Sequence, residues 1–383
     1  MTVALDHLDR LVAFETVSSR SNLDLVDWVA QRLASAGARI TRVSNEAGEK
    51  ECLVATMGPA REGGLMLSAH SDVVPVDGEV WTSDPFRLRR DGGRVVARGA
   101  ADMKGFLACS LAAMEQIDAA ALKRPVHLAL SYDEELGCTG TDDLVDVLRE
   151  AIPLPGIAIV GEPTLLRIVS AHKGARVYET EFHGRSAHSS QSHRGVSSNV
   201  HAARFIAMLD RHFDRLGEVR TAVADLQPPQ TTFNVGLMTG GWALNIIPDF
   251  TRLVWEFRNI PEVDADQVEA EILGWIAATG LPEMQAQWSG ARIETRRTAN
   301  VPALDPAMNR AARDEVHRRT GCKGDDAVPF GTEAGFFQGM GVPTVVCGPG
   351  SIDVAHKPDE YVEIAQIERA ERMLGDMIAW TAD

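Results

Sequence analysis

The chain has 383 residues, of which 45% are hydrophobic and 24% are charged, and its formal net charge is −16. These proportions are typical of globular enzymes, and the length is sufficient for two domains. The negative charge argues against nucleic acid or an anionic membrane surface as a partner, because both are bound through basic patches.

The N-terminal segment and the cysteines indicate the cellular compartment of the protein. No apolar stretch reaches the roughly 18 residues of a membrane-spanning helix, and the first residues lack the pattern of a secretory signal peptide. The five cysteines are widely spaced and form no Cys-x-x-Cys pair. We therefore expect a cytoplasmic enzyme without structural disulfides and without thiolate metal ligands.

The N-terminal part alternates helical and strand patterns. Helical spacing is found at residues 5–19, 22–37, 105–117 and 141–150. Apolar runs typical of buried strands are found at residues 63–70, 125–135 and 156–163. Strands that alternate with helices predict an α/β fold with a mixed, mostly parallel sheet flanked by helices. In such sheets ligands bind beyond the carboxyl ends of the strands.

The pattern changes after Lys173. Half-buried strands are predicted at residues 175–184, 231–241 and 250–260, and long helices at 197–216 and 265–280. A helix at 308–321, a strand at 344–348 and a helix at 364–380 then follow. We expect an inserted α+β domain at residues 174–288. Residues 1–173 and 289–383 would form one discontinuous catalytic domain.

His70 and Asp72 stand at the end of a predicted strand. If the strand continues, their side chains share one face. An acid beside a metal-bound imidazole can accept its second N–H and fix the tautomer. The alternative is a surface His-x-Asp sequence at a strand end.

Three further acids occupy comparable places. Asp102 follows the turn ARGAAD, where it fits a helix cap or a bridge between two cations. Glu134 and Glu135 follow the apolar run VHLAL closely. Adjacent acids point in different directions, so one can bind metal while the other transfers a proton. A solvated turn is the alternative for this pair.

Glu162 and His356 complete the set. Glu162 directly follows the run IAIVG, and His356 lies in a loop rich in Gly and Pro. Each has an ordinary explanation when taken alone. Together these positions supply only nitrogen and oxygen ligands, without a competing cysteine. They predict two divalent cations, with zinc preferred and Co²⁺ or Mn²⁺ as substitutes.

The chain resembles a known family in the motifs HSDVVP, RGAADMKG, DEE, GEPT, GRSAHSS and GPGSIDVAHKPDEY. This is the family of co-catalytic zinc metallopeptidases that includes acetylornithine deacetylase, succinyl-diaminopimelate desuccinylase and carboxypeptidase G-type enzymes. The resemblance runs nearly end to end and is greatest to the acetylornithine deacetylase branch. It implies a zinc-peptidase-like catalytic domain with an inserted ferredoxin-like lid domain, through which the chain would form a homodimer.

The resemblance also implies a role for each site residue. His70 and Glu162 would bind one metal, and Glu135 and His356 would bind the other. Asp102 would bridge the two metals. Asp72 would orient His70. Glu134 would act as the general base on a water that both metals activate.

Further roles are implied for the insert and for a later loop. His188 resembles a lid histidine that reaches the site of a neighbouring subunit and stabilises the oxyanion. Asn245 and Arg258 would bind substrate, since a guanidinium suits an amino-acid carboxylate. An exposed strand charge is the alternative for Arg258. Gly331 and Thr332 fall in an expected substrate-contacting loop.

We therefore predict an amidohydrolase that removes an acyl group from a small N-acyl amino acid, with N-acetylornithine as the first choice. N-succinyl-diaminopimelate, dipeptides and other acyl amino acids are alternatives within the same chemistry. An ornithine side chain needs an acidic neighbour, for which Glu333 is a candidate. A silent binding protein ranks lower because Glu134 and every predicted ligand are present. A dinuclear phosphoesterase also ranks lower, because such sites usually hold more His and Asn.

Overall fold

The computed structural model describes residues 2–383, which divide into two compact units. The first unit comprises the chain up to Ala171, Leu304–Ala327 and Thr332–Asp383. The second comprises His172–Ala303 and Val328–Gly331. No helix within residues 2–383 is both long enough and apolar enough to cross a membrane.

An eight-stranded mixed sheet forms the centre of the first unit, in the order β1-β2-β6-β3-β7-β16-β8-β15. Four adjacent central strands run parallel: β6 (Val126–Ser131), β3 (Leu65–His70), β7 (Ile157–Pro163) and β16 (Thr344–Gly348). The outer strands are β1 (Arg39–Ser44), β2 (Glu51–Met57), β8 (Val169–His172) and β15 (Asp326–Val328). The central strands are buried on both faces, as expected of apolar runs without alternation.

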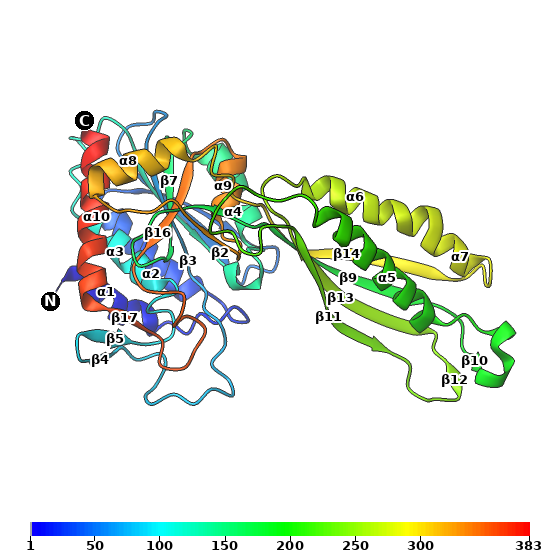
Figure 1. Ribbon diagram of the computed structural model, residues 1–383. Coiled ribbons are helices and arrows are strands. Elements are labelled where there is room, and N and C mark those ends of the chain that lie inside the picture. Colours follow the sequence, from blue (N-terminus) through cyan, green and yellow to red (C-terminus); the bar gives the residue numbers. More distant parts are fainter. Residues whose placement is uncertain (1) are drawn as a thin grey trace. The chain divides into compact units, whose positions relative to one another are not determined.

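Helices cover both faces of this sheet (Figure 1). One face carries α1 (Val3–Val12), α2 (Leu23–Ser35), α3 (Lys104–Met114), α8 (Arg310–Thr320) and α10 (Ile364–Ala382). The other carries α4 (Thr141–Ala151) and α9 (Ala334–Gly339). The predicted α/β class, with a mostly parallel sheet flanked by helices, is confirmed.

The sequence of helix α3 lacks a polar stripe because the helix is covered on both sides. It lies against the sheet on one side and is covered by α1 and α10 on the other, so nearly all of its residues are buried. Its Phe106 ring occupies the space beside Gly161, where an added Cβ would lie 1.9 Å from the ring. The turn that carries Asp102 leads directly into this fixed helix.

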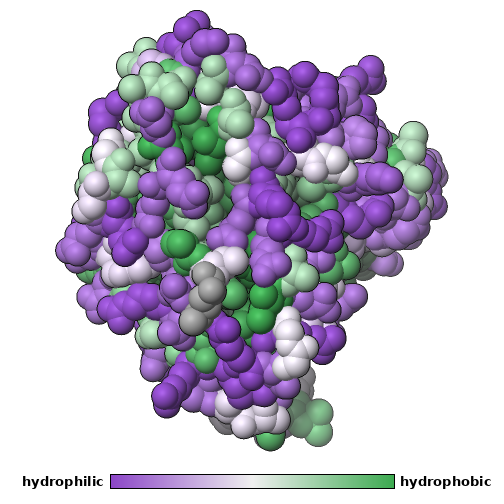
Figure 2. All heavy atoms as spheres, turned by 90° about the vertical axis from the view of Figure 1, so that its left-hand side faces the viewer, coloured by the Kyte–Doolittle hydropathy of each residue, from purple (hydrophilic) through white to green (hydrophobic). Residues whose placement is uncertain are grey.

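The face of the first unit that carries α10 is mostly hydrophilic, with small apolar patches between the polar side chains (Figure 2). The small strands β4 (Arg89–Asp91), β5 (Arg94–Val96) and β17 (Tyr361–Glu363) form a separate three-stranded sheet. Pairing of β17 with β5 joins the end of the His356 loop to the chain just before Asp102.

The second unit contains a four-stranded antiparallel sheet in the order β11-β13-β9-β14. Its strands are β9 (Ala175–His183), β11 (Thr232–Gly240), β13 (Phe250–Arg258) and β14 (Arg292–Val301). Helices α5 (Ser198–Leu216) and α6 (Ala265–Trp275) cover one face (Figure 1). Phe182, Phe205 and Trp255 pack between the layers.

The predicted insert ended at residue 288, whereas β14 pairs with β9 in this sheet and the second unit continues to Ala303. The sequence of β14, RIETRRTANV, is rich in arginine, and only Ala299 and Val301 are buried. An exposed edge strand of this kind carries a weak apolar signal. A small two-stranded antiparallel sheet, β10 (Ala187–His188) with β12 (Ile246–Ile247), completes the unit.

Candidate metal centre

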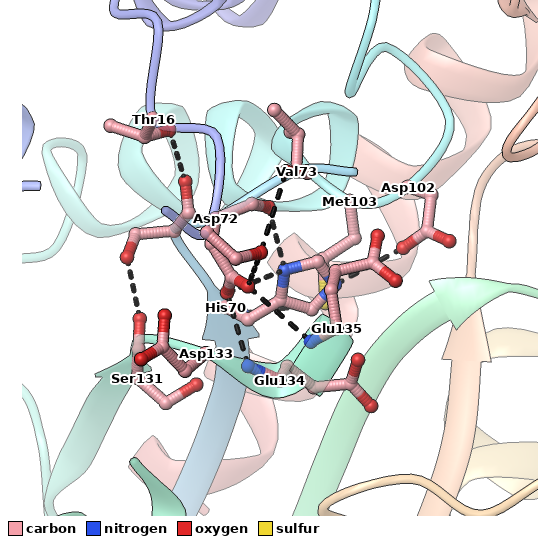
Figure 3. Close-up of polar contacts among 12 residues, drawn as sticks. Thr16, His70, Asp72, Val73, Asp102, Met103, Ser131, Asp133, Glu134 and Glu135 are labelled. Atoms are coloured by element: carbon pink, nitrogen blue, oxygen red, sulfur yellow. Dashed lines mark hydrogen bonds and ion pairs between the residues drawn. The ribbon is translucent and has the colours of Figure 1, made fainter. Parts of the chain in front are cut away.

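The predicted metal ligands come together at the carboxyl ends of the four central parallel strands. His70 is the last residue of β3, and Glu162 lies near the end of β7. Glu134 and Glu135 begin a 3-10 turn after β6, and His356 lies in the loop after β16. Figure 3 shows His70, Asp102 and the two adjacent glutamates turned toward one another. The parallel arrangement therefore collects side chains that lie far apart in the sequence.

Asp102 lies between the two imidazoles. Its Oδ1 is 3.1 Å from Nε2 of His70, and its Oδ2 is 3.3 Å from Nε2 of His356. Each carboxylate oxygen thus faces a different histidine, which is the geometry that a bridging carboxylate requires. Asp102 is only 5% exposed, so its charge is largely removed from water.

Glu135 and Glu162 flank this arrangement on opposite sides. Glu135 Oε2 lies 2.9 Å from Nε2 of His356. Glu162 Oε1 lies 3.8 Å from Nε2 of His70 and accepts no hydrogen bond from the residues that the structure describes. Two separate pairings result, one around His70 and the other around His356, with Asp102 shared by both.

The tautomer of His70 follows from its neighbours. Nδ1 of His70 lies 2.9 Å from the backbone carbonyl of Asp72, which can only accept a hydrogen bond. Nδ1 therefore carries the proton in the neutral ring, and the lone pair of Nε2 faces Asp102 and Glu162. This orientation leaves Nε2 able to bind a metal.

An acid beside a metal-binding histidine often accepts a hydrogen bond from the imidazole N–H, but the Asp72 carboxylate is mainly bonded to other groups. The Asp72 carboxylate is 3.5 Å from Nδ1 of His70, and its main hydrogen bonds go elsewhere. It accepts the Ser18 hydroxyl at 2.7 Å and the backbone N–H groups of Glu134 and Glu135 at 3.2 and 3.3 Å. Asp72 thus fixes the turn that presents both glutamates, a contact that the local sequence did not reveal.

The pKa values show how strongly negative charge accumulates here. Burial raises the pKa of Glu162 well above its usual range, and the Asp102 and Glu134 charges add to the shift. Burial, followed by the Asp102 charge, raises the pKa of Glu135 to about 7. Hydrogen bonds to Asp102 and Glu135 raise the pKa of His356 to about 10. The clustered carboxylates thus form a site that favours positive charge.

Glu134 belongs to the same electrostatic cluster, but within the described part of the chain it lies within salt-bridge distance of no imidazole. Burial raises its pKa well above the usual range, and Glu135 and Asp102 add to the shift against the opposing effect of His70. Its Oε1 accepts only a weak hydrogen bond from the Cys138 thiol, at 3.4 Å. Glu134 is therefore less constrained than Glu135.

The residues fit divalent cations. Ligand-capable atoms of His70, Asp102 and Glu135 all lie within 4.8 Å of one another, as do those of His70, Glu134 and Glu162. The unsatisfied Glu162 oxygen is buried, and such an oxygen is costly unless a cation or donor reaches it. Nitrogen and oxygen donors with no thiolate suit zinc and similar ions.

The predicted residues of the second unit fall at two ends of its sheet. His188 pairs with Ile246 in the two-stranded sheet of β10 and β12, and the carbonyl of Asn245 accepts a hydrogen bond from the Ser189 N–H at 2.9 Å. His188 is exposed, and its Nδ1 lies 2.8 Å from the Ser190 hydroxyl. His188 and Asn245 are thus neighbours, next to the start of β13.

Arg258 lies at the other end of β13, where its Nη2 is 3.2 Å from Glu256. β13 advances eight residues from Phe250 to Arg258, which at about 3.3 Å per residue is roughly 26 Å. The structure therefore does not bring Arg258 and Asn245 of one chain to the same small ligand.

The loop before α9 contains the remaining predicted residues. Gly331 packs so closely on Val301 that an added Cβ would lie 2.6 Å from its side chain. The Thr332 hydroxyl accepts the Ala334 N–H at the start of α9. Glu333 is fully buried and accepts hydrogen bonds from the hydroxyls of Ser68 and Thr141, both at 2.9 Å.

Comparison with known proteins decides the family. A sequence profile of Peptidase family M20/M25/M40 matches residues 66–380. The chain belongs to this family. It is accordingly a hydrolase that acts on amide bonds, and it is similar to acetylornithine deacetylases. The enzyme of that name from Myxococcus xanthus is 38% identical, over 97% of this chain and 96% of the relative. The one from Proteus mirabilis is 32% identical, over 96% and 92%.

Solved structures of M20 proteins share the fold. A metallo-carboxypeptidase from Sulfolobus solfataricus superimposes with a TM-score of 0.75 at 18% identity, covering 100% of both chains. A dinuclear metal-binding peptidase from Bacillus subtilis gives 0.68 at 14% identity, covering 98% of this chain and 97% of the other. Both structural matches cover the first and the second unit of this chain.

Proposed function

We propose that this M20 enzyme is a dinuclear metal-dependent deacylase of N-acyl amino acids, with N-acetylornithine as its substrate and ornithine and acetate as products. The observation that carries the proposal is Asp102, whose two oxygens face two histidines at the ends of parallel strands. The choice of substrate rests on the 38% identity to a relative named acetylornithine deacetylase.

Five residues would hold the cations. One cation would be bound by His70 and Glu162 and the other by Glu135 and His356, with Asp102 between them. Zinc is our first choice, and Co²⁺ or Mn²⁺ would substitute. Divalent cations held by these residues would supply Lewis-acid chemistry, polarising the acyl carbonyl and lowering the pKa of a nearby water.

Glu134 would move the proton. Among the described residues it forms no ion pair with an imidazole, and its carboxylate lies within the same cluster as the proposed ligands, so it can serve as a proton acceptor without being needed as a ligand. Glu134 would take the proton of the attacking water and give it to the amide nitrogen as the C–N bond breaks. The acyl group would leave as a carboxylate and the amino acid as a free amine.

The second unit would act as a lid and dimerisation domain. Arg258 would hold the substrate carboxylate, and His188 would donate a hydrogen bond to the developing oxyanion. Because His188 and Asn245 lie beside the start of β13 and Arg258 lies at its end, roughly 26 Å of strand away, we infer that His188 and Asn245 serve the site of a second copy. Gly331 and Thr332 would line the substrate site.

A homodimer through the second unit is supported by its edge strand. β11 is at the edge of the four-stranded sheet. It exposes Leu237 (64%) and Met238 (48%), and Trp242 and Leu244 follow in the exposed turn. Unpaired backbone groups beside exposed apolar side chains favour pairing with another strand. The five cysteines, all free, agree with a reducing location such as the cytoplasm.

The test is a substrate panel combined with elemental analysis. Purified enzyme would be assayed for release of amine from N-acetylornithine, other N-acetyl amino acids, N-succinyl-diaminopimelate and dipeptides. Two metal equivalents and preferential hydrolysis of N-acetylornithine are expected. Full activity after exhaustive dialysis against a chelator would contradict the metal role.

Desuccinylation is the second candidate, because it uses the same metal chemistry on a different acyl group. A succinyl group needs a further cationic contact for its free carboxylate. A higher kcat/KM for N-succinyl-diaminopimelate than for N-acetylornithine would favour this candidate and leave the metal centre unchanged.

A further inference from the structure

Glu360 joins the loop of His356 to the turn of Asp102. Its side chain is 1% exposed. Oε1 accepts hydrogen bonds from the backbone N–H groups of Ala101 at 2.9 Å and Asp102 at 3.0 Å. Oε2 accepts the backbone N–H of Gly99 at 3.1 Å. One carboxylate from the first segment thus holds three amide donors within four residues of the second, those of Gly99, Ala101 and Asp102.

A buried arginine holds Glu360 in place. Nη1 of Arg98 donates to Oε2 of Glu360 at 3.0 Å and to the Lys357 carbonyl at 3.3 Å. Nη2 donates to Glu79 at 2.6 Å, and the guanidinium lies 5.0 Å from the centre of the Trp81 ring. Because Arg98 is also 1% exposed, the ion pair is protected from water and its geometry is fixed.

The backbone of Asp102 depends on these contacts. Gly99–Met103 is a turn, and regular helix begins only at Lys104. The Asp102 carboxylate faces His70 and His356 at comparable distances, 3.1 and 3.3 Å. His70 is fixed by the central strand β3, whereas His356 is held by an irregular loop. Of the two distances from Asp102, to His70 and to His356, Glu360 therefore controls the one to His356.

We propose that Glu360 is a positioning residue that sets the spacing between Asp102 and His356, and with it the affinity for the second of two divalent cations. This inference rests on the proposed metal roles. The position requires a carboxylate because four donors converge on its two oxygens. A glutamine would replace one acceptor oxygen with an amide nitrogen that faces other donors.

The test is a Co²⁺ titration of the metal-free full-length protein, followed by visible absorption and by competition with a chelator. The wild type should bind two equivalents. Glu360→Gln should bind the first with unchanged affinity and the second about 10- to 100-fold more weakly. Asp359→Asn is the matched control, because Asp359 lies in the same loop but accepts hydrogen bonds from Thr82 instead. It should bind both equivalents like the wild type.

Circular dichroism of each metal-free variant separates folding from metal binding. Glu360→Asp, which keeps both oxygens on a shorter side chain, should show the same selective loss. A folded Glu360→Gln with wild-type affinity for both equivalents would overturn the proposal. So would an equal loss of both, or failure of both variants to fold, because the residue would then serve the fold in general. Uptake of a single equivalent by the wild type would instead refute the dinuclear function itself.

Discussion

Glu134 and Glu135 are adjacent in sequence but differ in their contacts. Glu135 lies against His356 at 2.9 Å, whereas the Glu134 side chain accepts, from residues 2–383, only the Cys138 thiol. Glu134→Gln removes the proton acceptor without removing a proposed ligand. We expect kcat to fall by about 10²- to 10⁴-fold while both metal equivalents remain, as measured by steady-state kinetics and elemental analysis.

Glu135→Gln is the contrasting variant for this prediction. It should lose the metal equivalent that His356 binds, because an amide is a much weaker ligand than a carboxylate. If Glu134→Gln lost metal to the same extent, Glu134 would be a ligand and another group would have to act as the base.

His127 provides a pH-dependent prediction away from the metal centre. It is fully buried in β6, its Nδ1 lies 2.9 Å from the Thr56 hydroxyl, and its Nε2 has no partner among the described residues. Burial, with a smaller contribution from Arg39, lowers its pKa to about 4. The folded protein therefore keeps this ring neutral, whereas the unfolded chain protonates it below about pH 6.5.

Since the unfolded state binds the extra proton, His127 makes the folded protein less stable as the pH falls from about 6.5 toward 4. Its contribution to the unfolding free energy should fall by up to about 1.4 kcal/mol per pH unit. In His127→Asn this dependence should be absent. The measurement is urea unfolding of both metal-free proteins at pH 7 and pH 5. An equal pH dependence in both would show that the ring is already protonated in the folded state.

At the scale of elements, the contact between β7 and α3 places Glu162. A Cβ on Gly161 would lie 1.9 Å from the Phe106 ring, and one on Gly348 would lie 2.0 Å from the Gly161 carbonyl. Gly161→Ala should therefore push β7 away from α3, at a cost of about 1–3 kcal/mol in unfolding free energy. It should also weaken metal binding, because Glu162 is the next residue.

Gly274→Ala is the matched control for this prediction. Gly274 lies inside α6, and a Cβ added there meets nothing within 4 Å. This substitution should raise stability by up to about 1 kcal/mol, since alanine favours helix more than glycine does. Unfolding in urea tests both variants. If Gly161→Ala were as stable as the wild type, β7 and α3 could move apart without a loss of unfolding free energy.

The elements explain which features the sequence could predict. The strands that carry His70 and Glu162 are continuous apolar runs buried on both faces, so their pattern is strong and their ends locate the site. β14 was missed because its edge position leaves Arg296 and Arg297 exposed. The hydrogen bonds of Asp72 and Glu360 were also missed, because each joins segments that only the folded chain brings together.

At the scale of the whole molecule, the proposed dimer can be tested by complementation. In our proposal a complete site uses Glu134 from one subunit and His188 from its partner. A Glu134→Gln dimer and a His188→Ala dimer should each be nearly inactive. In a mixed dimer, one of the two sites combines an intact Glu134 with an intact His188, whereas the other lacks both.

Random reassortment of the two variants gives about half mixed dimers, each with one complete site. Co-refolded mixtures should therefore recover about a quarter of wild-type activity, and elemental analysis should show unchanged metal content throughout. If His188 acted within its own chain, no mixed dimer would contain a complete site, because each subunit would still lack one of the two groups. Mixtures no more active than the separate variants would thus place His188 in its own subunit's site or outside catalysis altogether.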